Sequence, residues 1–67
     1  MQIQVNGEFR ELPGPLALAD LLAQMHVPTH SGVAVLLNGE VVRRADWTRT
    51  TVQPADALEI VRATVGG

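Results

Sequence analysis

The C-terminal tail contains the residues whose types and spacing point most directly to chemistry. The chain of 67 residues ends in Val65-Gly66-Gly67. Glycine has no Cβ, so a pair of glycines can stay extended and pass through a narrow channel. The α-carboxylate of Gly67, at the tip, is an anion at neutral pH and therefore a poor electrophile. We expect a partner enzyme to activate it, most simply as an acyl adenylate made from ATP.

An acyl adenylate at Gly67 has two kinds of onward chemistry. Sulfide or a persulfide converts it to a thiocarboxylate, whereas an amine or a thiol converts it to a covalent conjugate. Terminal glycines are also often merely disordered. The residues of the tail alone leave these interpretations open.

No other group of residues predicts a catalytic or metal site. The absence of cysteine excludes disulfides, thiolate ligands and thiol catalysis. Ser31 lies beside His30, but neighbouring loop residues point apart and make a weak nucleophile–base pair. His26 and His30 have the spacing of helical metal ligands, but Pro28 between them interrupts a helix. We expect no catalytic residues, no bound metal and no bound cofactor.

The charge balance limits the classes of partner. Five arginines, no lysine and seven acidic residues give a net charge of −2, which lacks the basic face of a nucleic-acid-binding protein. Arg43-Arg44 is too short for a phosphate patch and fits either a solvated hairpin end or the steering of an acidic partner. The chain has no signal pattern and no apolar run of about 18 residues. We therefore expect a cytoplasmic protein with no membrane or nucleic-acid partner.

The first half of the sequence predicts a hairpin followed by a helix. Residues 1–5 alternate between apolar and polar side chains, as a half-buried strand does, and residues 9–12 return after Asn6-Gly7, a strong hairpin signal. Over residues 16–25, apolar side chains recur at the spacing of an amphipathic helix. This stripe consists of Leu18, Leu21, Leu22 and Met25. We expect Pro28 to end the helix, within a polar loop over 26–32.

The second half predicts three further elements. The apolar run 33–37 indicates a central strand that is apolar on both faces, so its second face needs a partner. Asn38-Gly39 returns this strand through residues 40–42. We expect a short helical turn within 43–50, with Trp47 filling the bottom of the core. After a turn at 53–56, residues 57–63 form the last strand.

Together these elements predict a single α+β domain, with residues 1–63 globular and 64–67 a flexible Gly-Gly tail. One helix can cover only one face of a four- to five-stranded sheet. We expect the first and last strands, which no hairpin connects, to pair in parallel at the centre of a mixed sheet. That arrangement is the β-grasp, or ubiquitin-like, fold.

The uncovered face of this sheet is expected to carry a small apolar patch beside the tail. If Val35 faces the helix, its neighbour Leu36 faces outward, and we expect Val61 and Val42 to join it there. Exposed apolar patches are typical of partner-docking surfaces, although single exposed apolar residues are common.

The whole chain resembles the ThiS family of sulfur-carrier proteins of thiamine (thiazole) biosynthesis. The matching segments are residues 1–7, 18–22, 33–35 with 38–39, Val41-Val42 with Arg44 and Trp47, Asp56 with 58–61, and Gly66-Gly67. The most specific combination is residues 38–42, the Arg-x-x-Trp at 44–47 and the terminal glycines. Two residues depart from the family pattern. Arg43 stands where Pro is usual, and Ala55 stands where Gly is usual.

The resemblance implies a carrier whose Gly67 carboxylate is adenylated by an E1-like, ATP- and zinc-dependent adenylyltransferase of the ThiF type. Gly66 and Val65 would thread into the partner's active site. The resemblance further implies sulfur from cysteine, through a desulfurase or another donor, and delivery to a thiazole synthase of the ThiG type.

Three other functions remain open at this point. A MoaD-like small subunit of molybdopterin synthase would share the tail chemistry, and so would a ubiquitin-like modifier attached to target lysines. A β-grasp interaction module would use no tail chemistry.

Overall fold

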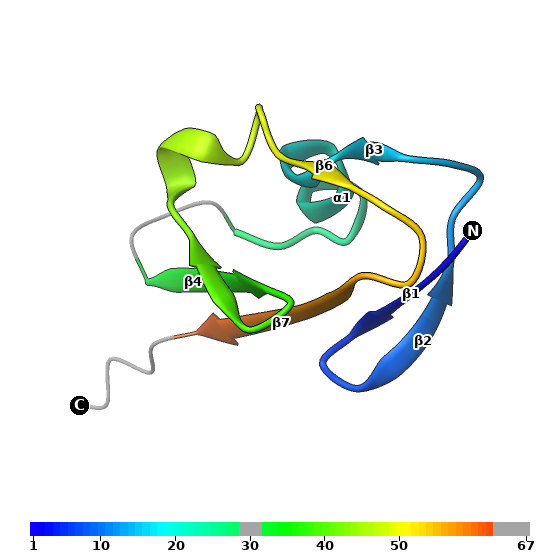
Figure 1. Cartoon of the computed structure of the whole chain (residues 1–67). Coiled ribbons are helices and arrows are strands. Elements are labelled where there is room, and N and C mark those ends of the chain that lie inside the picture. The colour runs from blue at the N-terminus through cyan, green and yellow to red at the C-terminus, as the bar shows by residue number, and fades with distance from the viewer. Residues whose placement is uncertain (29–31, 63–67) are drawn as a thin grey trace.

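The computed structural model describes residues 1–28 and 32–62 (Figure 1). The elements are β1 (Gln2–Val5), β2 (Glu8–Glu11), β3 (Leu16–Ala17), α1 (Leu18–Gln24), β4 (Val33–Leu37), β5 (Glu40–Val42), the 3-10 turn η1 (Arg44–Asp46), β6 (Thr51–Val52) and β7 (Ala57–Arg62). Five strands form one sheet in the order β2-β1-β7-β4-β5, and β3 pairs with β6 in a second, two-stranded sheet.

The five-stranded sheet is mixed. β1 and β7 pair in parallel, and the other neighbours pair antiparallel. Figure 1 shows α1, β3 and β6 together on one side of this sheet. The parallel pairing of the first and last strands, with one helix over one face, confirms the predicted α+β fold of the β-grasp type.

The core lies between α1 and the sheet. Its buried members are Ile3, Val5, Leu12, Leu18, Leu21, Leu22, Val27, Val35, Trp47, Val52 and Leu58. The three leucines of the predicted helical stripe are at most 1% exposed, and Met25 packs against them. Each fully buried leucine contributes about 1.5–3 kcal/mol relative to an exposed one, so this stripe fixes the helix to the sheet.

The helix is shorter at its start than the predicted range 16–25. Leu16 and Ala17 are extended instead, because they pair with Val52 and Thr51 as β3 and β6. The free amides of the first helical turn then find backbone acceptors: the N–H of Leu18 donates to the carbonyl of Thr50 at 2.7 Å. A backbone carbonyl thus replaces the side-chain cap that the helix lacks.

The helix ends before Pro28 in a Schellman motif. The N–H of Val27 donates to the carbonyl of Leu22, and the N–H of His26 donates to the carbonyl of Ala23. His26 has a φ of 57°, the left-handed conformation that this motif requires. Val27 is buried beside the helix and anchors its end.

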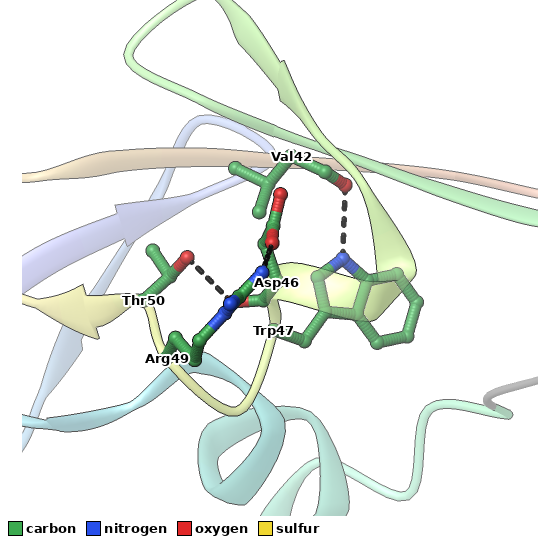
Figure 2. A network of polar contacts seen from close by, with 5 residues as sticks. All are labelled: Val42, Asp46, Trp47, Arg49 and Thr50. Carbon is green, nitrogen blue, oxygen red and sulfur yellow. Dashed lines mark hydrogen bonds and ion pairs between the residues drawn. The ribbon is translucent and has the colours of Figure 1, made fainter.

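The predicted turn around Trp47 is confirmed. The Trp47 side chain is 3% exposed, and its indole Nε1 donates to the carbonyl of Val42 at 3.0 Å (Figure 2). The Thr50 hydroxyl donates to the backbone carbonyl of Asp46 at 2.7 Å, and Arg49 forms an ion pair with the Asp46 carboxylate. This turn joins the end of β5 to β6 and covers one end of the core.

Candidate functional site

β7 is the last described element before the C-terminal residues, and it lies at the centre of the sheet. On one side it pairs with β1 through Ala57 and Leu58. On the other side it pairs with β4 from Leu58, opposite Leu37, to Arg62, opposite Val33. β7 thus has a paired strand on each side near its start and β4 beside its last residues.

The Asn6-Gly7 turn lengthens the contact between β1 and β7. The N–H of Asn6 donates to the carbonyl of Leu58 at 2.8 Å. The side-chain Oδ1 of Asn6 then accepts a hydrogen bond from the N–H of Ile60 at 2.7 Å. A side-chain oxygen thus continues the parallel ladder past the end of β1, toward the C-terminal half of β7.

The Asn38-Gly39 turn holds the start of β7 in a similar way. The N–H of Asn38 donates to the carbonyl of Ala57 at 2.7 Å, and Asn38 Oδ1 accepts from the N–H of Ala57 at 2.9 Å. Asn38 Nδ2 also donates to Asp56 Oδ1 at 3.0 Å, while Asp56 Oδ2 accepts from the N–H of Gln53 at 2.8 Å. We refer to the Asn6 and Asn38 side chains as the two clamps of β7.

The sequence predicted two hairpins at these positions but not their contacts with β7. The available signal was the asparagine at the first turn position. Its side chain combines tolerance of a left-handed backbone with a carbonyl oxygen that can accept a hydrogen bond.

The face of the sheet away from α1 carries part of the predicted docking patch. Leu36 lies opposite Glu59, and the next pair on the same face is Ala34 with Val61. Residues opposite each other share a face, so Leu36 and Val61 both face away from the core residue Val35. Leu36 is half-buried and Val61 is 48% exposed.

The prediction that Val42 faces outward with them is wrong. Val42 lies opposite Val35, which is fully buried, and it packs against the core. Val41, opposite Leu36, takes the outward place and is 67% exposed. We therefore define the outer patch as Leu36, Val41 and Val61. An open depression of about 640 Å³ beside it runs along β7, lined by Leu36, Gly39 and residues 57–62, with Asn6 and Gly7.

Several predicted site residues lie outside the described part of the chain. They are Gly67, Gly66 and Val65 of the tail, together with His30 and Ser31. The expected boundary between residues 63 and 64 also lies there. Among residues 1–28 and 32–62, no group of three or more His, Cys, Asp or Glu side chains is placed to hold a metal ion. No helix in those ranges is long and apolar enough to cross a membrane.

The β-grasp core and the terminal glycine pair together define a small protein of the ubiquitin-like class. A family model describes a smaller group within that class, the ThiS family, and it matches residues 3–67, which include the terminal glycines. The chain belongs to the ThiS family.

Two solved structures agree with this assignment. The crystal structure of the thiamine biosynthesis protein ThiS from Geobacter metallireducens is 36% identical, with a TM-score of 0.86 and full coverage of both chains. The NMR solution structure of a thiamine biosynthesis protein from the same organism is also 36% identical. Its TM-score is 0.80, and the match covers 100% of this chain and 88% of that one. No match was found among curated proteins. The resemblance inferred from the sequence is confirmed, and it supports a sulfur-carrier role in thiamine biosynthesis.

Proposed function

We propose that this protein carries sulfur, as a thiocarboxylate on Gly67, to the enzyme that builds the thiazole ring of thiamine. The observation that carries the proposal is that the ThiS match extends through residue 67 on a fold matching a ThiS protein with a TM-score of 0.86. The protein would act as a co-substrate of its partners rather than as an enzyme.

The first proposed step activates the tail. In the active site of a ThiF-like adenylyltransferase, a Gly67 carboxylate oxygen attacks the α-phosphorus of ATP. A C–O–P bond forms and pyrophosphate leaves. ATP belongs to the partner, and this chain binds no cofactor of its own. The acyl carbon becomes electrophilic because AMP is a good leaving group.

The second proposed step loads the sulfur. Sulfide attacks the acyl carbon and displaces AMP, which leaves the thiocarboxylate. A persulfide formed from cysteine by a desulfurase can attack the acyl carbon instead, which also displaces AMP and gives an acyl disulfide. A thiol then reduces the S–S bond of this acyl disulfide and leaves the thiocarboxylate. A ThiG-like thiazole synthase then takes the sulfur.

The described residues supply the platform for this chemistry. The two clamps fix β7, and with it the point from which the tail extends. Five residues follow Arg62, and a fully extended chain of that length spans at most about 17 Å. The partner must therefore bring its active site within that distance of the sheet, with Gly66 and Val65 threading into it. The outer patch of Leu36, Val41 and Val61, on β4, β5 and β7, is our proposed docking surface.

The partners and location follow from this chemistry. The proposed ATP-dependent activation and cysteine-derived sulfur donor support a cytoplasmic location, which is part of this proposal. The proposal requires neither a membrane nor a nucleic acid.

Intact-mass spectrometry tests the proposal directly. The protein is incubated with ATP, a ThiF-like adenylyltransferase and a sulfur donor. The expected product has one oxygen replaced by sulfur, and fragmentation locates the change at Gly67. Omission of ATP and deletion of Gly67 serve as controls, and both should abolish the change. An unchanged mass with an active adenylyltransferase would contradict the proposal.

The same reagents separate the alternative functions. Transfer of the sulfur to a molybdopterin precursor, with none to the thiazole, would assign the chain to molybdopterin synthesis. Lysine-linked adducts that survive reducing agent would indicate a protein modifier. Full activity without Gly67 would indicate an interaction module.

A further inference from the structure

Three arginines gather at the end of the sheet from which the tail leaves. Arg62 is the last residue of β7 and lies opposite Val33. Val42, the last residue of β5, lies opposite Val35, and Arg43 continues that strand in an extended conformation with φ −66° and ψ 144°. Arg44 follows as the first residue of η1. Both β5 and β7 run toward this end.

The register sets the spacing of the cluster. If β5 is continued by one residue, Arg43 lies level with Ala34 of β4, and Ala34 in turn lies opposite Val61 of β7. Only β4 separates β5 from β7, so their backbones are two strand spacings, about 10 Å, apart. Arg43 therefore lies on the outer face, level with Val61, whereas Arg62 shares the helix-side face of Val33, which packs against the core. With Arg44 at the start of η1, the arginines form a rim that flanks the last residues of β7 from both faces of the sheet.

The charges of this rim are not neutralised by neighbours within the described part of the chain. Arg43, Arg44 and Arg62 are exposed, and none of them forms an ion pair with a described residue. Arg49 nearby is paired with Asp46. Two other carboxylates lie at the opposite end of these strands, since Glu40 begins β5 and Asp56 precedes β7. Glu59 lies on the outer face two residues before Val61, and it forms no ion pair with a described residue.

We propose that Arg43, Arg44 and Arg62 form a cationic rim that docks against an acidic protein surface around the entrance that receives the tail. This inference rests on the proposed function, because it concerns the partner that adenylates Gly67. A chain with a net charge of −2 would be repelled by an acidic partner in most orientations. The positive charge of the three arginines attracts the acidic partner to the end of the sheet that carries the tail. Electrostatic steering of this kind raises association rates about 10- to 1,000-fold.

Charge reversal with a matched control tests the rim. Arg43→Glu and Arg62→Glu are compared with Arg10→Glu, which makes the same change in net charge on the exposed edge strand β2. Association with the ThiF-like adenylyltransferase is followed by stopped-flow fluorescence between about 0.02 and 0.5 M salt. Each rim variant should associate about 10-fold more slowly at low salt, with a flatter salt dependence. Arg10→Glu should change the rate less than about twofold.

The outcomes that overturn the rim are distinct from those that overturn the proposed function. If Arg10→Glu slowed association with the adenylyltransferase as much as the rim variants do, net charge alone would matter. Unchanged association rates in both rim variants would contradict the proposed role of the rim. Binding of a short RNA that is lost in the rim variants would assign the arginines to phosphate instead. Intact-mass analysis is run in parallel at saturating adenylyltransferase. There the rim variants should acquire the thiocarboxylate fully, whereas failure of the unaltered protein to acquire it would overturn the proposed function itself.

Discussion

The two Asn-Gly turns have the same backbone but hold β7 to different extents. Asn6 and Asn38 have φ values of 52° and 51°, and Gly7 and Gly39 have values of 83° and 87°. Both asparagines use Oδ1 to accept a hydrogen bond from a β7 amide. Asn38 also donates to Asp56, which is itself bonded to Gln53. In contrast, the Asn6 side chain forms one hydrogen bond within residues 1–28 and 32–62, the one from the N–H of Ile60.

This difference separates what a turn sequence determines from what the fold adds. Two residues that tolerate positive φ are enough to form a tight hairpin. The number of further bonds depends on which segments lie nearby. Asn38 clamps the start of β7 within a network, whereas Asn6 clamps the half of β7 nearer the tail with a single bond. The start of the strand is thus more strongly restrained than the part leading to the tail.

Asn38→Gly should have the largest effect on stability. Glycine keeps the positive φ but removes the carboxamide, which leaves the Ala57 amide and one Asp56 oxygen without their partner. We expect a loss of about 2 kcal/mol in the free energy of unfolding, as two hydrogen bonds, one to a carboxylate, are removed. Urea denaturation followed by circular dichroism measures this. A loss equal to that of Asn6→Gly would contradict the difference between the clamps.

Gly7→Ala and Gly39→Ala should lower the free energy of unfolding by nearly the same amount. An added Cβ at either position meets no heavy atom within 4 Å, so the cost arises from the left-handed backbone alone. For an L-residue this cost is about 1–2 kcal/mol. Thermal unfolding of the two variants side by side measures it. A difference well above 0.5 kcal/mol, about the limit to which independent effects agree, would show that the turns differ in their backbones as well as in their side-chain bonds.

Asn6→Gly should cost about 1 kcal/mol, the value of one hydrogen bond, and the effect should be local. Hydrogen exchange at the Ile60 amide should become about fivefold faster, because its acceptor is lost, while exchange at Ala57 should not change. Asn38→Gly serves as the matched control with the opposite pattern. Uniformly faster exchange along β7 in both variants would mean that the strand opens as one unit.

The sequence predicted the elements better than it predicted the contacts between them. Both hairpins, the leucine stripe and the anchoring role of Trp47 depend on local signals, namely turn residues, periodicity and side-chain size, and the structure confirms them. The clamps join residues 19 and 54 positions apart, and no local pattern contains such pairs. The strands β3 and β6 have two residues each, too few for a periodic signal to separate them from the adjacent helix.

The error at Val42 has a different cause, because the information was present in the sequence. A two-residue Asn38-Gly39 turn makes Leu37 the partner of Glu40, and counting back pairs Val42 with Val35. Opposite residues share a face, so turn length alone places Val42 inward and Val41 outward. Register, rather than hydrophobicity, decides which valine belongs to the outer patch.

Ala55 extends the comparison to a turn that contains neither asparagine nor glycine at its left-handed position. Its φ is 69°, so Ala55 carries backbone strain at a point just before β7. Ala55→Gly removes this strain of about 1–2 kcal/mol but adds about 0.4–1 kcal/mol of unfolded-state entropy. The net gain should be about 0.5 kcal/mol, which raises Tm by about 2–4 °C in a domain of this size. The same change to glycine thus stabilises at Ala55 and destabilises at Asn38, because only the asparagine side chain has partners to lose. A lower Tm for Ala55→Gly in differential scanning calorimetry would mean that the alanine methyl makes a contact worth more than the strain it imposes.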